Sequence, residues 1–409
     1  MISKKRGDKP STFSSWKKPP PKPSKFSAHS RPDTPQPTEQ RLFSKAATAI
    51  QTQDSTSARA HSASPQARRA DADQPRRALP ARPPLTTTVL SPGHRIQVSA
   101  VLSIHNRSRL FQRALDGYLW QTIPRDRWEI VLVDDMSSVD LAQAYSHLIG
   151  RLNLRHVKID HTRHPIYSEM SALGPGPDGR MRWYHTPAIS LNIGFALAAG
   201  QVLCVCHPEI LHAPTNFERA VATLRRSNEY LFGTTYLGTQ ATNRMLEVSP
   251  DWTSLGWPGF LDASGAVSLQ SYGYECYWYT SFLPRAAAVA VGGVDLAYMK
   301  GVAGEDDDFR ERVKRAGWDA IHMPEIEGFH QDHSDEVEPH RRRDTEAWDD
   351  GLRRNRAIYQ ARKLSGNWPF PANGGTDWSC LDCVVEEVRW TVGSRVPERI
   401  PGKAAAIRA

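Results

Sequence analysis

The sequence predicts an α/β fold in which a parallel sheet is covered by helices, and three features support this prediction. Apolar, β-branched runs alternate with helical patterns from residue 96 onward. Each of these runs ends in polar residues, as expected where parallel strands present side chains to a ligand. The helical patterns between them are long enough to connect one parallel strand to the next.

The first half of the pattern is a βαβαβ unit. Predicted strands fall at 96–106, 128–138 and 154–160, and predicted helices at 108–121 and 139–150. Asn106 follows the first strand, and Asp134 and Asp135 follow the apolar part of the second. No Gly-rich phosphate loop follows the first strand, which disfavours dinucleotide-binding and P-loop functions.

The second half continues the alternation. It predicts a helix at 188–199, a buried strand at 201–206, an aromatic strand with a short helix and a Gly-Gly turn within 277–295, and helices at 305–317 and 345–369. The strand at 201–206 runs directly into His207, Pro208 and Glu209. Polar groups therefore follow a third strand end.

Residues 1–95 differ in composition from the rest of the chain. They hold 18 Lys and Arg against 6 Asp and Glu, whereas the remaining residues hold 34 against 38. The segment is rich in Pro, Ser and Arg and poor in apolar residues, so we predict a disordered basic tail. Such a tail is either a solvated spacer or a contact for a membrane surface, an acidic partner or nucleic acid.

The absence of a membrane span and of a secretory signal, together with the number of cysteines, indicates the cellular compartment of the protein. No apolar run is long enough to span a membrane, and the N-terminus lacks the apolar core of a secretory signal, although an organelle transit peptide stays open. Five cysteines indicate no disulfide framework, and Cys380 and Cys383 lack the second pair that a zinc site needs. We expect a cytoplasmic protein, peripheral at the membrane if the tail contacts lipid.

Four consecutive acids occupy positions 305–308, between a small-residue loop and a predicted helix that ends at Gly317. Acids stabilise a helix N-terminus, because its free N–H groups and dipole favour negative charge. This role explains one or two of them, and we assign it to Asp307 and Asp308. Crowded carboxylates also raise one another's pKa, which makes a carboxylate a better general base.

Four segments, in this order, resemble the GT-A glycosyltransferases, most closely the inverting enzymes of family 2. They are VSAVLSIHNRSRLFQRALDGYLWQT, EIVLVDDMSS, LNIGFALAAGQVLCVCHPEI and the stretch from VGGVD to GEDDDFRERVKRAG. The resemblance implies a GT-A fold, the Rossmann-like fold of nucleotide-diphospho-sugar transferases. It divides the chain into a tail at 1–95, a GT-A domain at 96–345 and a helical or irregular extension at 346–409.

The same resemblance implies a metal-dependent transfer of a sugar from a nucleotide-sugar donor to a hydroxyl of a glycan or glycoconjugate, as in polysaccharide biosynthesis. The GEDDD motif is similar to that of galactosyl- and N-acetylgalactosaminyl-transferases, which implies a UDP-linked sugar. The family's metal-binding DxD motif is His207-Pro208-Glu209 here. This implies Glu209 as a ligand of Mn²⁺ or Mg²⁺, with His207 as a ligand or a hydrogen-bonding partner of the ribose. His330, from a late loop, is the second candidate ligand, and His333 competes with it.

The remaining site residues are implied in the same way. Asp306 is the expected catalytic base, and Glu305 the expected contact for acceptor hydroxyls. Four residues are expected to bind the nucleotide: Asn106, Asp134, Asp135 and Asn192. Trp278 lies in an aromatic stretch, where it either stacks on a sugar face or packs in the core.

Two other functions compete with this one. A catalytically weak GT-A module that only binds a nucleotide or glycan is favoured by His207 in place of an acid and disfavoured by the intact acid motif. Nucleic-acid binding by the tail is disfavoured, because few aromatic residues, such as Trp16 and Phe26, are interspersed with its basic residues. The sequence also has no known RNA-binding pattern. We therefore expect no nucleic-acid partner.

Overall fold

The computed structural model describes residues 95–148, 150–167, 187–249, 251–272, 278–333, 345–369 and 378–401. The predicted tail therefore lies outside the described residues, apart from Arg95. Within these ranges, no helix has both the length and the apolar character needed to cross a membrane.

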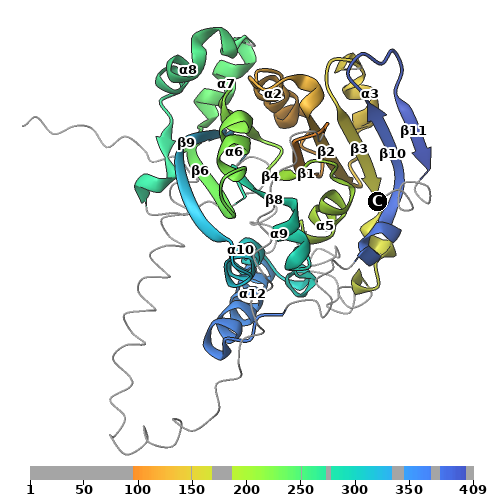
Figure 1. Cartoon of the computed structure of the whole chain (residues 1–409), viewed down its shortest axis with the longest axis vertical. Coiled ribbons are helices and arrows are strands. Elements are labelled where there is room, and N and C mark those ends of the chain that lie inside the picture. The colour runs from red at the N-terminus through yellow and green to blue at the C-terminus, as the bar shows by residue number, and fades with distance from the viewer. Residues whose placement is uncertain are drawn as a thin grey trace, which may run out of the picture. The chain divides into compact units, whose positions relative to one another are not determined.

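The described residues form one mixed sheet of eleven strands (Figure 1). Its order is β11-β10-β3-β2-β1-β4-β8-β6-β9-β5, and β7 pairs with β6. The strands are β1 (Val98–Ile104), β2 (Trp128–Asp135), β3 (Leu154–Ile159), β4 (Val202–Val205), β5 (Ile210–His212), β6 (Glu229–Leu237), β7 (Val267–Ser268), β8 (Ser281–Pro284), β9 (Asp319–His330), β10 (Val384–Trp390) and β11 (Glu398–Pro401). The predicted α/β class is confirmed, and the predicted parallel strands form one part of this mixed sheet.

Strand direction places the functional loops. β1, β2, β3 and β4 are parallel neighbours. The short strand β8 runs antiparallel to both β4 and β6, so β6 points the same way as β4, and β9 is parallel to β6. The carboxyl ends of β1, β2, β4, β6 and β9 therefore lie at one edge of the sheet, where α/β proteins bind ligands.

Helices pack on both faces of the sheet. They are α2 (Ser108–Leu119), α3 (Leu141–Ala144), α5 (Ala188–Leu197), α6 (Asn216–Leu224), α7 (Gln240–Val248), α8 (Gly256–Ser264), α9 (Arg285–Ala290), α10 (Glu305–Arg315) and α12 (Thr345–Ser365). The 3₁₀ turns are Arg125–Arg127, Ser146–Leu148, His161–Arg163, Trp252–Leu255, Leu269–Tyr272, Leu296–Lys300 and Trp378–Cys383. The helix predicted at 139–150 is thus a single turn, α3, followed by a 3₁₀ turn.

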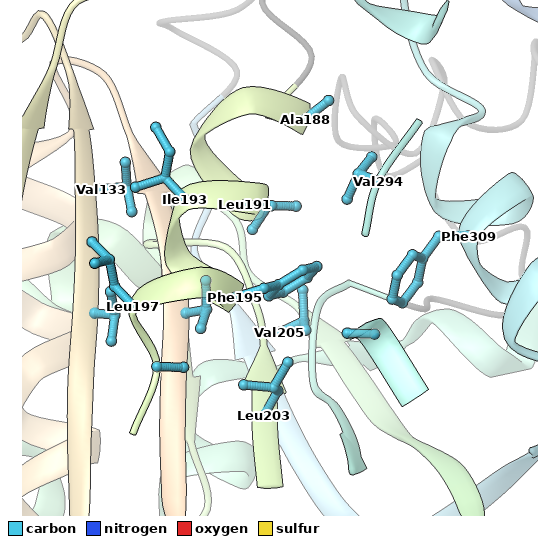
Figure 2. Close-up of a cluster of buried hydrophobic side chains, with 14 of the residues drawn as sticks. Val133, Ala188, Leu191, Ile193, Phe195, Leu197, Leu203, Val205, Val294 and Phe309 are labelled. Atoms are coloured by element: carbon cyan, nitrogen blue, oxygen red, sulfur yellow. The ribbon is translucent and has the colours of Figure 1, made fainter. Parts of the chain in front are cut away.

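The two faces of the sheet have separate cores. Val101 of β1 faces a cluster with α5, α9 and α10, whereas its neighbours Ala100 and Leu102 face a cluster with α2, α3 and α6. All ten residues of α5 are buried, as expected for a helix that is apolar on every side. Figure 2 shows Phe195 of α5 and Phe309 of α10 pointing toward each other, with ring centroids 5.9 Å apart.

The C-terminal segment contributes to the same sheet. β10 pairs antiparallel with β3, and β11 pairs with β10, so both extend the sheet beside its parallel part (Figure 1). These strands differ from the helical or irregular structure expected after residue 345. The predicted charged helix at 345–369 is present as α12, and Gly366 follows it with a φ of 65°.

The acid Asp308 anchors α10 rather than only facing the helix N-terminus, as the sequence had suggested. It is completely buried. Its Oδ2 accepts a hydrogen bond from Arg312 Nε at 2.7 Å, and its Oδ1 accepts bonds from Tyr298 Oη and from Arg362 of α12. Arg362 also donates to Asp295 Oδ2 at 2.7 Å. The carboxylate of Asp308 therefore ties α10 to α12 and to the 3₁₀ turn before α10.

We predict that Asp308→Asn lowers the free energy of unfolding by about 3 kcal/mol, because it leaves the buried charge of Arg312 without its carboxylate and leaves Arg362 with Asp295 alone. Asp307→Asn, a partly buried acid on the same turn, is the matched control and should cost less than about 1 kcal/mol. Urea unfolding followed by circular dichroism measures both. Equal losses for the two variants would contradict the anchoring role of Asp308.

Candidate functional site

Three segments that are distant in sequence meet at the carboxyl edge of the sheet. Arg107 follows β1, Glu209 lies between β4 and β5, and His333 lies three residues beyond β9. His330 is the last residue of β9 and pairs with Ile210 of β5, rather than lying in a loop as expected. The common direction of β1, β4 and β9 brings these side chains together.

Glu209 is the centre of this group, and its side chain is completely buried. Its Oε1 accepts a hydrogen bond from Arg107 Nη1 at 2.8 Å. The same oxygen lies 3.5 Å from His207 Nδ1, 3.4 Å from His330 Nε2 and 3.2 Å from His333 Nε2. We call Glu209, His207, His330 and His333 the Glu209 centre.

The surroundings keep the Glu209 carboxyl ionised. Burial by itself would raise its pKa, but the Arg107 guanidinium, His333, and hydrogen bonds from His207 and His330 hold the pKa well below its usual range. The backbone is fixed as well, because the carbonyl oxygen of Glu209 accepts from the Gln331 side chain at 3.0 Å and from the Gln331 N–H at 3.3 Å. The centre therefore presents a rigid, negatively charged oxygen.

The centre fits a divalent metal ion. The ligand atoms of His207, Glu209 and His330 all lie within 4.8 Å of one another. Two ligands bound at ~2.1 Å to one tetrahedral ion are about 3.4 Å apart, which matches their distances to Glu209 Oε1. Among the described residues, Glu209 Oε2 and Nδ1 of His330 are buried without a hydrogen-bond partner. Such an unsatisfied carboxylate oxygen is costly unless an ion or water contacts it.

The acid motif lies beside this centre. Glu305 and Asp306 begin α10, and Gly304 before them has a φ of 87°, a conformation that favours glycine. Burial raises the pKa of Asp306, while backbone N–H groups and the charges of His207 and Arg310 counteract this. Packing connects α10 to the Glu209 centre, because Trp278 contacts Phe309 of α10 and the next residue, Tyr279, contacts two imidazoles of the centre.

Glu305 is more deeply buried than Asp306. Burial, followed by the charges of Asp306 and Asp307, raises the pKa of Glu305 to about 8. Its Oε2 is buried and, within the described residues, has no hydrogen-bond partner. A carboxyl that is protonated near neutral pH can donate a hydrogen bond as well as accept one.

The expected nucleotide-binding acids are held by histidines at the same edge. Asp134 Oδ2 lies 2.9 Å from His156 Nε2, and Asp135 Oδ1 lies 2.7 Å from His161 Nδ1. Both acids are largely buried at the end of β2. Their position is that expected for nucleotide contacts, and that role stays a prediction.

Asn106 connects two of the edge loops. Its φ is 57°, a left-handed conformation that Asn tolerates. Its Oδ1 accepts hydrogen bonds from the N–H and the hydroxyl of Ser138, both at 2.8 Å, which joins the loop after β1 to the loop after β2. Asn106 is exposed at the sheet edge, so it is placed where a ligand can reach it.

Two other expected residues are engaged in packing. Asn192 is buried in α5, where its Nδ2 donates to the Val294 carbonyl at 2.9 Å and its Oδ1 accepts from the Val294 N–H at 2.7 Å. Trp278 is buried and packs against Phe309, with ring centroids 6.2 Å apart. This position favours core packing over sugar stacking for Trp278, and the nucleotide contact of Asn192 stays a prediction.

The sequence reasoning did not identify Arg107 or Tyr279. Arg107 directly follows Asn106 at the end of the first strand, so its position was a usable signal, although its partner Glu209 is 102 residues away. The ring of Tyr279 lies edge-on to His207 and His330, with centroid distances of 5.1 and 4.9 Å. Tyr279 therefore holds two imidazoles of the Glu209 centre in place.

A second group of ligand-type side chains lies in the core. Cys204, Cys206 and His212 are all buried, and their ligand atoms lie within 4.8 Å of one another. The Asn216 amide nitrogen lies 3.4 Å from His212 Nδ1. We interpret this group as a part of the core that includes Tyr118, whose hydroxyl lies 3.1 Å from Cys206 Sγ.

Comparison with known proteins gives structural similarity only. No protein-family model matches the chain. No curated protein gives a significant match either. One similar solved structure is the mannosyltransferase PcManGT from Pyrobaculum calidifontis in complex with GDP-Man and Mn²⁺, with 15% identity, a TM-score of 0.41, and coverage of 69% of this chain and 68% of that chain.

TarS from S. aureus is also similar in structure. Its 1-349 fragment in complex with UDP has 12% identity, a TM-score of 0.39, and coverage of 66% of this chain and 72% of that chain. The same fragment in complex with UDP-GlcNAc has 12% identity, a TM-score of 0.37, and coverage of 58% and 59%. These scores are low, so an assignment of function rests on the side chains of the site.

We predict that Glu305→Gln flattens the pH dependence of stability. The folded carboxyl stays protonated up to about pH 8, whereas the unfolded carboxyl ionises near its ordinary pKa of 4.5. The contribution of Glu305 to stability is therefore full below pH 4.5 and is lost as the pH rises toward 8, by up to ~1.4 kcal/mol per pH unit. Thermal unfolding at pH 5, 6.5 and 8 should show a steeper decline for the wild type than for Glu305→Gln.

The control for this experiment is Glu311→Gln, which removes a more exposed acid from the same helix. Its decline between pH 5 and 8 should equal that of the wild type. If Glu305→Gln declines as steeply as both, Glu305 does not carry the raised pKa.

Proposed function

We propose that this chain is a metal-dependent, inverting glycosyltransferase that moves a sugar from a nucleotide-diphosphate donor, with UDP the preferred nucleotide, to a hydroxyl of a glycan or glycoconjugate. One observation carries the proposal: at the carboxyl edge of the sheet, the buried Glu209 carboxylate and the imidazoles of His207 and His330 form a group that fits a divalent ion. The helix α10, which begins with the acid motif, is connected to this group by packing: Trp278 contacts this helix, and the next residue, Tyr279, contacts two of the imidazoles. The resemblance to family 2 enzymes supports the same assignment.

Donor binding follows from the charges at the sheet edge. A divalent ion bound by the Glu209 centre would neutralise the diphosphate leaving group. Arg107 is 26% exposed, so its guanidinium can turn from Glu209 to a phosphate oxygen. Asp134, Asp135 and Asn106 would contact the base and ribose from the ends of the neighbouring strands.

The transfer itself requires a proton acceptor. The acceptor hydroxyl loses its proton to the Asp306 carboxylate while its oxygen bonds to the anomeric carbon, and the bond from that carbon to the diphosphate breaks. Attack from the face opposite the leaving group inverts the anomeric configuration. The neighbouring Glu305 would hold the acceptor by hydrogen bonds.

A second function, binding of a nucleotide or glycan without turnover, is favoured by the ion pair between Arg107 and Glu209. In that case the guanidinium stays on the carboxylate and takes the place of an ion. Transfer or hydrolysis of a donor in the presence of Mn²⁺ separates the two functions, because a binding module produces neither.

We predict that a UDP-sugar together with Mn²⁺ raises the melting temperature of the protein, since a ligand of the folded state stabilises it by mass action. Glu209→Gln should abolish the Mn²⁺-dependent part of this shift. The control Glu327→Gln changes a carboxylate of β9 that accepts from Tyr236 at 2.9 Å, and should keep the full shift. A set of UDP- and GDP-sugars that gives no shift with Mn²⁺ would contradict donor binding.

We predict that Asp306→Asn lowers kcat by about 10²- to 10⁴-fold while donor binding changes little, because the amide keeps the size of the side chain and removes the base. Asp307→Asn, the neighbouring acid, should change kcat less than about threefold. Both variants need melting temperatures close to that of the wild type. A fully active Asp306→Asn variant would mean that the base is another group.

A further inference from the structure

The Glu209 centre is unusually rich in imidazole for a site that would hold a diphosphate. Three imidazole nitrogens lie 3.2 to 3.5 Å from the single carboxylate oxygen Glu209 Oε1. Where the family's DxD motif has an acid, this chain has His207. The centre therefore offers several nitrogen ligands for each carboxylate ligand.

Most of these side chains are buried. The side chains of Glu209, His330 and His333 are 0%, 3% and 12% exposed. The His330 and His333 rings lie 5.0 Å apart, and Tyr279 packs against His330. His207, with 36% of its side chain exposed, forms the open side of the centre.

The charge of the centre is also small for a hard ion. Among the described residues with a side chain at the centre, Glu209 is the one carboxylate, and Arg107 already contacts it at 2.8 Å. The acid motif adds no carboxylate to this set, because Asp306 is not among the ligand atoms that lie within 4.8 Å of one another at the centre. Mg²⁺ requires oxygen ligands in octahedral geometry and keeps several waters. Imidazole ligands suit first-row transition ions instead.

We propose that the Glu209 centre selects a first-row transition ion such as Mn²⁺ or Co²⁺ and discriminates against Mg²⁺, and that His207 sets this preference. This inference rests on the proposed function for the role of the ion, while the selectivity follows from the ligand set alone. Replacing His207 with an acid restores a second carboxylate and adds a negative charge on the open side. That change should favour Mg²⁺.

The test is calorimetric titration of the full, chelator-treated chain with MnCl₂, CoCl₂ and MgCl₂, without a nucleotide. We expect Mn²⁺ and Co²⁺ to bind at least tenfold more tightly than Mg²⁺. Pulsed electron paramagnetic resonance of the Mn²⁺-loaded chain should show ¹⁴N coupling from bound imidazole. Binding of Mg²⁺ within twofold of Mn²⁺, or the absence of ¹⁴N coupling, would overturn the proposal. Both measurements use the wild-type chain, so they do not depend on whether a variant folds.

His207→Asp tests the residue that sets the preference. It should tighten Mg²⁺ binding about tenfold and reduce the ratio of Mn²⁺ to Mg²⁺ affinity. His147→Asp is the matched control, since it exchanges an exposed histidine that contacts Gln112 away from the centre, and should leave the ratio unchanged. An unchanged ratio in a folded His207→Asp variant would refute the role of His207.

These experiments distinguish a failure of the proposed metal selectivity from a failure of the proposed function. If Mg²⁺ and Mn²⁺ bind equally but a nucleotide sugar still raises the melting temperature, the selectivity is wrong and the transferase assignment survives. If Mn²⁺ binds selectively and no donor binds, the metal centre is right and the transferase assignment is wrong.

Discussion

The site depends on one constraint, the burial of an ionised carboxylate at the end of a strand. Glu209 is shielded from water, and an unpaired buried carboxylate costs several kcal/mol. Arg107, His207, His330 and His333 gather around Glu209 Oε1 and offset this cost. The same arrangement leaves Glu209 Oε2 without a protein partner in the described residues, so the surroundings stabilise the charge without satisfying the whole group. An ion that completes this coordination and contacts a diphosphate would link stability to function.

The strand directions of the sheet bring these groups to one edge. The reversed strand β8 lets β4, β6 and β9 point the same way, which places His207, Glu209 and His330 together. The acid motif reaches the edge by a different route, on α10. Asp308 and Arg362 attach that helix to α12, so the C-terminal part of the chain helps to hold the segment that carries Asp306.

The sequence predicted the parts of the fold whose signals are local. Asp134 lies at the end of the apolar strand β2 and Glu209 lies shortly after β4, so their place at the sheet edge could be predicted from the sequence. β9 was not recognised, because it has many exposed positions and lacks an apolar run. Arg362 lies 54 residues from Asp308, so their contact depends on tertiary packing that a local pattern does not encode. For the same reason β10, which pairs with the distant β3, was expected to be helical or irregular.

The most direct test of the account is the anomalous diffraction of crystals grown with MnCl₂ and UDP. The account predicts a manganese peak within about 2.5 Å of a Glu209 carboxylate oxygen, with the diphosphate on the same ion and the nucleoside beside Asp134 and Asp135. A manganese peak at a different group of residues, or UDP bound away from the carboxyl edge of the sheet, would contradict it.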